Sequence, residues 1–215
     1  MYKLFWSPGS AAMAPQAVLE EIGVAYELVR IDVAAKQHQQ ADYKTLNPNG
    51  RIPTLVDGDF VIFETAAICQ YLADRHPEAN LAPPVGTEAR GRYYQWLTYM
   101  TNTVQAAYMG WFHPDWTFAE PERQAALKAA SEQELYRAFQ VIDDGIGGQA
   151  WMAGEQFTLC DIWLAMLARW SRGMPRPMWC WPNIRRVVAA TYVRPAFRRM
   201  MDKQGIVWAD NWPQD

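Results

Sequence analysis

The sequence predicts an α+β protein in which a β-α-β-α-β-β-α domain is followed by an all-helical domain. Short β-prone runs alternate with helical stretches up to residue 75, and long helical periodicities begin only after residue 87. Between them, residues 77–84 read PEANLAPP, a composition typical of a linker. We therefore expect domains at residues 1–78 and 87–215, joined by residues 79–86.

The first part of the chain contains two predicted strands and one clear helix. Residues 2–6 and 26–31 are β-prone, and residues 11–22 carry apolar side chains at helical spacing before Gly23, a typical helix stop. Pro15 fits this helix only near its first turn. Residues 33–46 are polar and irregular, with a short helical turn expected at residues 41–46.

The stretch from residue 47 to residue 75 predicts a turn, a hairpin and a helix in succession. NPNG at residues 47–50 is dense in turn formers, and Asp57-Gly58 separates two β-prone runs at residues 54–56 and 60–63. Glu64-Thr65 then opens a helix, which His76-Pro77 ends.

The remainder of the chain is predicted to be helical, with helices at residues 87–112, 121–144, 181–190 and 195–203. A further helix starts at Thr158, where Thr is followed three residues later by Asp161, a variant of the capping box. Five arginines between residues 185 and 199 are interpreted as a solvated helix face.

Composition excludes several classes of function. The formal net charge of −3 over 215 residues argues against a nucleic-acid or anionic-membrane partner. We find neither a membrane-spanning apolar run nor a signal peptide. Three scattered cysteines and three isolated histidines indicate neither a disulfide framework nor a metal site. These features favour a reduced, cytoplasmic location.

Two positions in the central stretch have the chemistry of a binding site. Pro53 cannot donate to a β-ladder, and a cis Ile52–Pro53 bond would leave the backbone N–H and C=O of Ile52 free for a ligand. Thr65 lies at a helix start, which favours an anion, and Glu64 offers a carboxylate to a cation. Together these groups suit a small peptide, although a capped helix after a proline turn gives the same pattern.

The segments NPNGRIP, TLVDGDFVIF and ETAAICQYL resemble, in order and spacing, the glutathione-binding half of the glutathione S-transferases. The resemblance covers essentially the whole chain and is strongest to bacterial, beta-class-like members. It implies a thioredoxin-like first domain, with Ile52 and Pro53 at the cysteinyl unit of glutathione. It also implies that Glu64 and Thr65 hold the γ-glutamyl amine and carboxylate, and that His38 binds the glycyl carboxylate, unless that loop is simply solvated.

Conjugation of glutathione requires a thiolate, so the protein must lower a thiol pKa that is ordinarily about 8.5. We expect Ser10 to do this from the N-cap of the first helix, with the helix N-terminus behind it. Beta-class relatives have Tyr and Cys where this chain has Trp6 and Ala11, which excludes a tyrosine hydroxyl and a mixed disulfide there. Ser7 is the other available hydroxyl, and Ser10 serving only as a helix cap is the alternative.

The resemblance further implies a homodimeric transferase that joins glutathione, its co-substrate, to a small hydrophobic electrophile without a metal or redox cofactor. A glutathione-dependent peroxidase or dehalogenase, or a non-catalytic member that binds glutathione or an apolar ligand, is the alternative function. The family lines its hydrophobic co-substrate site with the first long helix of the helical domain. The candidates for that site are Tyr108, Met109, Trp111 and Phe112, although such residues often serve packing alone.

Overall fold

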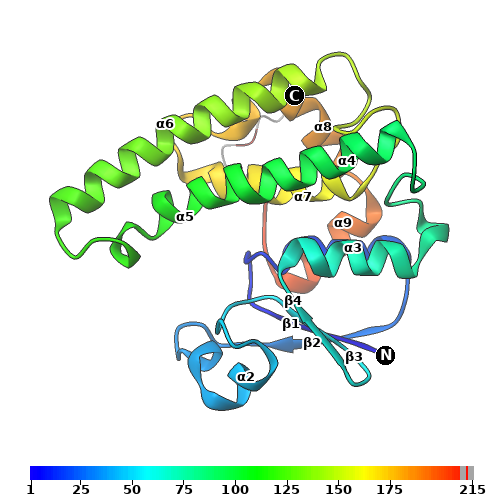
Figure 1. Ribbon diagram of the computed structural model, residues 1–215, viewed down its shortest axis with the longest axis horizontal. Coiled ribbons are helices and arrows are strands. Elements are labelled where there is room, and N and C mark those ends of the chain that lie inside the picture. The colour runs from blue at the N-terminus through cyan, green and yellow to red at the C-terminus, as the bar shows by residue number, and fades with distance from the viewer. Residues whose placement is uncertain (209–211, 213–215) are drawn as a thin grey trace. The chain divides into compact units, whose positions relative to one another are not determined.

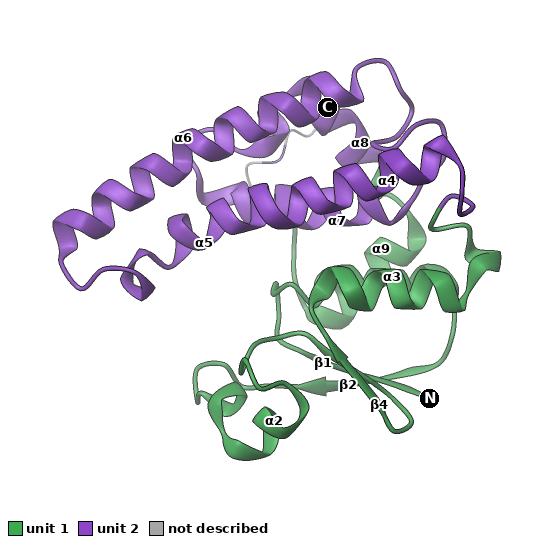
Figure 2. Cartoon of the chain, in the orientation of Figure 1, with its two compact units in different colours: residues 1–82, 191–210 green, residues 83–190, 211–215 purple. Residues whose placement is uncertain are grey.

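The computed structural model describes residues 1–208 and 212, and it divides the chain into two compact units (Figure 2). Unit 1 contains residues 1–82 and 191–210, and unit 2 contains residues 83–190 and 211–215. The sequence-based ranges divided the chain in linear order, whereas here a C-terminal segment belongs to the first unit.

Unit 1 is built on a four-stranded mixed sheet (Figure 1). Its strands are β1 (Tyr2–Trp6), β2 (Tyr26–Arg30), β3 (Thr54–Asp57) and β4 (Phe60–Phe63), in the order β2-β1-β3-β4. β1 pairs parallel with β2 and antiparallel with β3, and β3 and β4 form an antiparallel hairpin. Because Asp57 pairs with Phe60, the hairpin turn is formed by Gly58 and Asp59, one residue later than expected.

The helices of unit 1 are α1 (Met13–Ile22), α2 (Ala41–Leu46), α3 (Thr65–Arg75) and α9 (Pro195–Gln204). Short 3₁₀ turns occur at Gln37–Gln39 and Pro77–Ala79. α1 packs against both α3 and α9, which explains why eight of its ten residues are buried. The core includes Leu4, Val18, Leu55, Ile68 and Leu72, all fully buried.

Unit 2 is helical, which together with unit 1 confirms the predicted α+β class (Figure 1). It contains α4 (Glu88–Tyr99), a π-helical segment (Met100–Gln105), α5 (Ala106–Phe112), α6 (Pro121–Ile146), α7 (Leu159–Trp170) and α8 (Pro182–Tyr192), whose last two residues belong to unit 1. Short 3₁₀ turns occur at Pro114–Trp116, Ser171–Gly173 and Met178–Cys180. α7 is buried along its whole length, so it forms the centre of this unit.

The predicted capping box at the start of α7 is confirmed. The Thr158 hydroxyl accepts a hydrogen bond from the Cys160 N–H at 3.2 Å, and the Asp161 carboxylate accepts one from the Thr158 N–H at 2.8 Å. The same carboxylate accepts the Met152 N–H at 2.8 Å, which ties the preceding loop to the helix start. These bonds satisfy amides that a helix N-terminus otherwise leaves unpaired.

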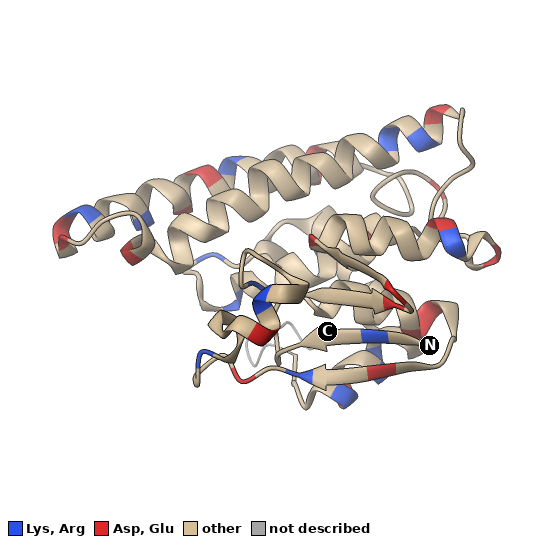
Figure 3. Ribbon diagram, turned by 60° about the horizontal axis from the view of Figure 1, so that its bottom comes forward, with Lys and Arg blue, Asp and Glu red and all other residues tan. Residues whose placement is uncertain are grey.

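Charged residues are spread over both units, with Lys and Arg interspersed among Asp and Glu (Figure 3). In the described part of the chain, no helix combines the length and the apolar character needed to cross a membrane.

Candidate functional site

The strand register brings the predicted glutathione-binding segments to one end of the sheet. Trp6 pairs with Arg30, so the loops after β1 and β2 leave the sheet together. Thr54 pairs with both Phe5 and Phe63, so the segment before β3 and the start of α3 lie at that same end. We call this region the sheet end: residues 7–10, 32–40, 52–53 and 64–65.

The Ile52–Pro53 peptide bond is cis, as the sequence predicts. The β3 ladder begins only at Thr54, and the N–H and C=O of Ile52 have no hydrogen-bond partner among the described residues. Since Ile52 is only half-buried, its peptide edge is available to a ligand.

Side chains from α2 and the neighbouring loop hold the turn that precedes Ile52. The Tyr43 hydroxyl and the Asn47 amide both donate to the Arg51 carbonyl, at 2.7 and 2.8 Å, and the Gln39 amide donates to the Gly50 carbonyl at 2.7 Å. These supporting residues could not be predicted from the sequence, because polar side chains in a polar loop give no periodic signal.

The start of α3 leaves backbone amides free. The first intrahelical bond runs from the Ile68 N–H to the Glu64 carbonyl at 2.9 Å, and no side chain caps the helix. The amides of Thr65, Ala66 and Ala67 therefore have no acceptor within α3, an arrangement that favours an anion. Thr65 is buried, while Glu64 is exposed and adopts a positive φ of 71°.

Ser10 does not occupy the N-cap of α1, contrary to the prediction. The helix begins at Met13 and its N-cap is Ala12, two residues after Ser10. Pro15 accounts for the shift, because a helix starting at residue 11 would place proline where an intrahelical N–H is needed. From its actual start, Pro15 is the third helical residue, where its missing N–H costs nothing.

The Ser10 hydroxyl is nevertheless held within the loop. It donates to the Ser7 carbonyl at 2.7 Å and accepts the Ala12 N–H at 3.3 Å. The Ser7 hydroxyl, by contrast, has no hydrogen-bond partner among the described residues. Trp6 is 7% exposed and its indole N–H is unpartnered within the described part of the chain.

His38 lies in the 3₁₀ turn Gln37–Gln39 and is half-buried. Its Nδ1 is enclosed and makes no hydrogen bond to any described residue. The adjacent Gln39 binds Gly50, so the loop that carries His38 is tied to the turn before Ile52.

The four candidates for the hydrophobic co-substrate site belong to unit 2, and they differ in accessibility. Tyr108 is fully buried, and its hydroxyl donates to the Leu167 carbonyl at 2.9 Å. Burial raises the pKa of Tyr108 well above its ordinary value. Trp111 is buried, Met109 is half-buried and Phe112 is 37% exposed. Of the four candidates, Met109 and Phe112 thus expose the most side-chain surface in unit 2 taken by itself.

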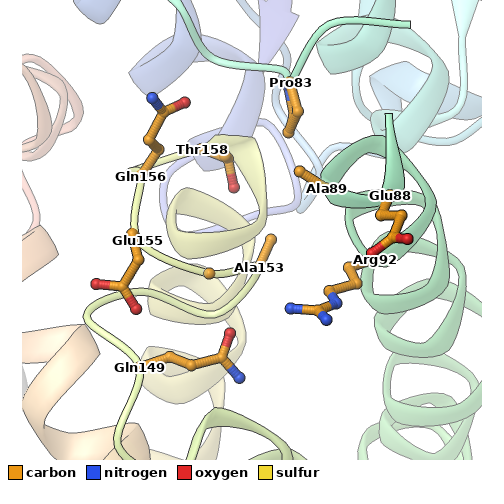
Figure 4. A pocket seen from close by; sticks show the side chains of 10 residues that line it. Pro83, Glu88, Ala89, Arg92, Gln149, Ala153, Glu155, Gln156 and Thr158 are labelled. Atoms are coloured by element: carbon orange, nitrogen blue, oxygen red, sulfur yellow. The ribbon is translucent and has the colours of Figure 1, made fainter. Parts of the chain in front are cut away.

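A cavity of about 500 Å³ in unit 2 is lined by the first turns of α4 and by the loop before α7 (Figure 4). Glu88 and Arg92 line one side, while Gln149 and Glu155 line the other. None of the predicted site residues lines this cavity.

None of the three cysteines is among the residues of the sheet end. Cys69 and Cys160 are fully buried, and burial raises the pKa of each thiol well above its ordinary value. Cys180 is exposed in unit 2. Because only a thiolate is strongly nucleophilic, neither buried cysteine is suited to attack a substrate.

Comparison with known proteins identifies both halves of the chain. A model of the glutathione S-transferase N-terminal domain matches residues 1–74, and a model of the C-terminal domain of the same family matches residues 94–195. Glutathione S-transferase GstA of Escherichia coli O157:H7 is 31% identical over 171 residues, which cover 79% of this chain and 82% of that protein.

Solved structures agree with these matches. A glutathione transferase from Methylococcus capsulatus strain Bath is 30% identical, with a TM-score of 0.85 and coverage of 96% of this chain and 100% of that one. A sphingomonad glutathione S-transferase complexed with glutathione is 28% identical, with a TM-score of 0.83 and coverage of 95% and 100%. On these matches of sequence and structure, the chain belongs to the glutathione S-transferase family.

Proposed function

We propose that this chain binds glutathione at the sheet end and transfers its sulfur to an electrophilic carbon of a small hydrophobic substrate. The observation that carries the proposal is the set of uncommitted groups at one end of the sheet. They are the peptide edge of Ile52, the first amides of α3, and the exposed carboxylate of Glu64.

These groups match the chemistry of glutathione group by group. The free peptide edge of Ile52, next to the buried Pro53, suits the cysteinyl unit, which carries both an N–H and a C=O. The α3 amides and the Thr65 hydroxyl suit the γ-glutamyl carboxylate, while Glu64 suits its ammonium. His38, with a ring nitrogen that no described residue binds, suits the glycyl carboxylate. The sphingomonad relative, 28% identical, was solved in complex with glutathione.

In the proposed reaction the glutathione thiol first loses its proton to solvent, and the thiolate then attacks the electrophile. A new carbon–sulfur bond forms while the leaving group departs with its bonding electrons. The Ser10 hydroxyl stabilises the thiolate after it turns from the Ser7 carbonyl, to which it donates in the free protein. The transfer needs no metal or redox cofactor, because glutathione itself supplies the nucleophile.

Met109 and Phe112 contribute accessible apolar surface for the electrophile, whereas Trp111 and the buried Tyr108 pack against Phe112. We further propose that the protein acts as a cytoplasmic homodimer, a state typical of the family. Its described cysteines are unpaired, in keeping with a reducing compartment.

The test is calorimetric titration with glutathione, followed by turnover assays with an aryl halide and an organic hydroperoxide. We expect binding and formation of the thioether from the aryl halide. Turnover of the hydroperoxide alone would reassign the protein as a peroxidase, and binding without turnover of a wider panel of electrophiles would indicate a non-catalytic member. Failure to bind glutathione would refute the proposal.

A further inference from the structure

The last residue of α9 is bonded to the loop that precedes Ser10. Gln204 is 4% exposed, and its Oε1 accepts the backbone N–H of Gly9 at 3.0 Å. Both residues belong to unit 1, although 195 positions separate them in the sequence. A helix that the sequence assigned to the all-helical domain therefore contacts the sheet end.

The Gln204 side chain is itself held by a chain of hydrogen bonds on α1 and β2. Its Nε2 donates to Oε1 of Gln16 at 2.8 Å, and Gln16 Nε2 donates to the Tyr26 hydroxyl at 3.3 Å. Tyr26 in turn donates to the carboxylate of Glu20. Every donor points the same way, from Gly9 towards Glu20, so each bond polarises the next.

The buried carboxylate of Glu20 lies at the far end of this series of hydrogen bonds. Its side chain is 6% exposed, and it accepts hydrogen bonds from Lys203 at 2.5 Å and from Arg199 at 2.8 Å, both on α9. Burial alone raises the pKa of Glu20, but the bonds from Lys203, Tyr26 and Arg199 outweigh burial and hold the pKa below its usual value. The arginine run is therefore not simply a solvated face.

Gly9 is the point at which this network acts on the proposed catalytic loop. Its positive φ of 68° reverses the chain immediately before Ser10, whose backbone N–H donates to the Ser7 carbonyl at 3.2 Å. A group that fixes the Gly9 peptide thereby fixes the direction in which Ser10 leaves the turn. Because the side chain must accept from Gly9 and donate to Gln16, it needs the carbonyl and NH₂ of an amide.

We infer that Gln204 is a positioning residue that holds the 7–10 loop in place for thiolate stabilisation through its bond to Gly9. The inference rests on the proposed function of this loop. In addition to packing against α1, α9 would then take part in the reaction, although it lies far from Ser10 in the sequence.

Three variants separate this role from general stability. Gln204→Leu keeps approximate size but removes both hydrogen bonds, and Gln204→Glu keeps only an acceptor for Gly9. Arg194→Gln is the matched control, because Arg194, the N-cap of α9, donates two hydrogen bonds to Glu21 of α1, at 2.6 and 2.8 Å. Each variant is measured by amide hydrogen exchange at Gly9, by thiolate absorbance of bound glutathione against pH, and by kcat and KM.

In Gln204→Leu we expect Gly9 exchange about tenfold faster than in the wild type. The bound thiol pKa should rise towards about 8.5 and kcat should fall about 10–100-fold, with KM for glutathione changing less. Gln204→Glu should recover part of each loss, while Arg194→Gln should lower stability and leave all three site measurements at wild-type values.

Equal effects of Gln204→Leu and Arg194→Gln, or equal losses in the two Gln204 variants, would overturn the inference in favour of packing. Unchanged Gly9 exchange in Gln204→Leu would also overturn it, whatever the protein binds. If the wild type binds no glutathione, the proposed function is refuted. The catalytic role of Gln204 is then refuted as well, even where the Gly9 exchange result shows that Gln204 holds the loop.

Discussion

Glu64 combines an unfavourable backbone conformation with an exposed, unpaired side chain. Its φ of 71° lies in a region that side chains rarely adopt, at a cost of about 1–3 kcal/mol. No described residue pairs with its carboxylate. A strained backbone whose carboxylate has no partner among the described residues is best explained by a ligand that the carboxylate binds.

We therefore predict that replacing Glu64 weakens binding without lowering stability. Glu64→Gly should weaken glutathione binding by about 1.5–3 kcal/mol, because a charge-assisted hydrogen bond is lost. Its free energy of unfolding should not fall, because glycine tolerates positive φ. Calorimetry and denaturant unfolding measure the two quantities. Asp59→Asn, an exposed carboxylate in the hairpin turn, serves as the charge control and should bind like the wild type.

The two serines of the 7–10 loop differ in what already binds them. Because Ser10 is held by Ser7 and Ala12 through two bonds, Ser10→Ala should disturb the loop slightly and remove the thiolate donor. We expect kcat about 10²–10³-fold lower, with glutathione affinity nearly intact. Ser7→Ala removes a hydroxyl without a described partner and is the control. If Ser7→Ala raised the pKa of the bound thiol and lowered kcat more than Ser10→Ala does, the role would belong to Ser7. Thiolate absorbance against pH and kcat measure the two effects.

At the level of single residues, the sequence predicted the groups at Ile52, Glu64 and Thr65 because turn and helix-start signals are local. It misplaced the start of α1 relative to Ser10, since the apolar periodicity extends through Ala11 and Ala12 although neither residue is helical. It could not find Gln204, because the partner of a polar side chain depends on packing between distant segments.

At the level of elements, α7 contains a buried carboxyl group that makes the stability of the protein depend on pH. Asp161 is fully buried, and its pKa is raised by burial from 3.8 to about 6, although the N–H groups of Met152 and Thr158 act to lower it. Between about pH 4 and pH 6 the folded protein therefore binds this proton more tightly than the unfolded chain. The resulting stability is fully present below pH 4 and is lost as pH rises through 6.

Asp161→Asn should remove this pH dependence, because an amide does not titrate. We expect the unfolding free energy of the wild type, relative to the variant, to fall by about 3 kcal/mol between pH 4 and pH 7. Urea unfolding of both proteins at a series of pH values measures this difference. Parallel stability profiles for the two proteins would contradict the prediction.

The helix predicted at residues 87–112 is interrupted by the π-helical segment Met100–Gln105. This segment contains Thr101, Asn102, Thr103 and Val104, residues of low α-helix propensity, and the Thr101 hydroxyl donates back to the Leu97 carbonyl at 2.8 Å. The signal was present in the sequence, but the apolar periodicity on either side outweighed it.

At the level of the whole molecule, the sequence predicted the fold class but not the membership of α9 in unit 1. Periodicity shows which face of a helix is apolar and does not show which element that face will cover. Phe197, Met200 and Met201 of α9 are buried, and α9 packs against α1.

A chain ending at residue 190 should therefore fail to form a stable unit 1. Removing three buried large apolar side chains costs about 5–8 kcal/mol, comparable with the stability of a whole domain. Hydrogen exchange of the amides in β1 and β3 should lose its protection relative to the full chain. Retained protection in these strands would show that α9 is dispensable for unit 1.

The membership of α9 in unit 1, together with residues 1–82, also affects protein synthesis. When residue 82 leaves the ribosome, α1 still lacks the partner that α9 supplies, and residues 83–190 must be translated before it arrives. At roughly 5–20 residues per second, the apolar surface of α1 that α9 covers stays exposed for on the order of ten seconds. During this interval we expect chaperones that bind exposed apolar segments to recognise the first unit.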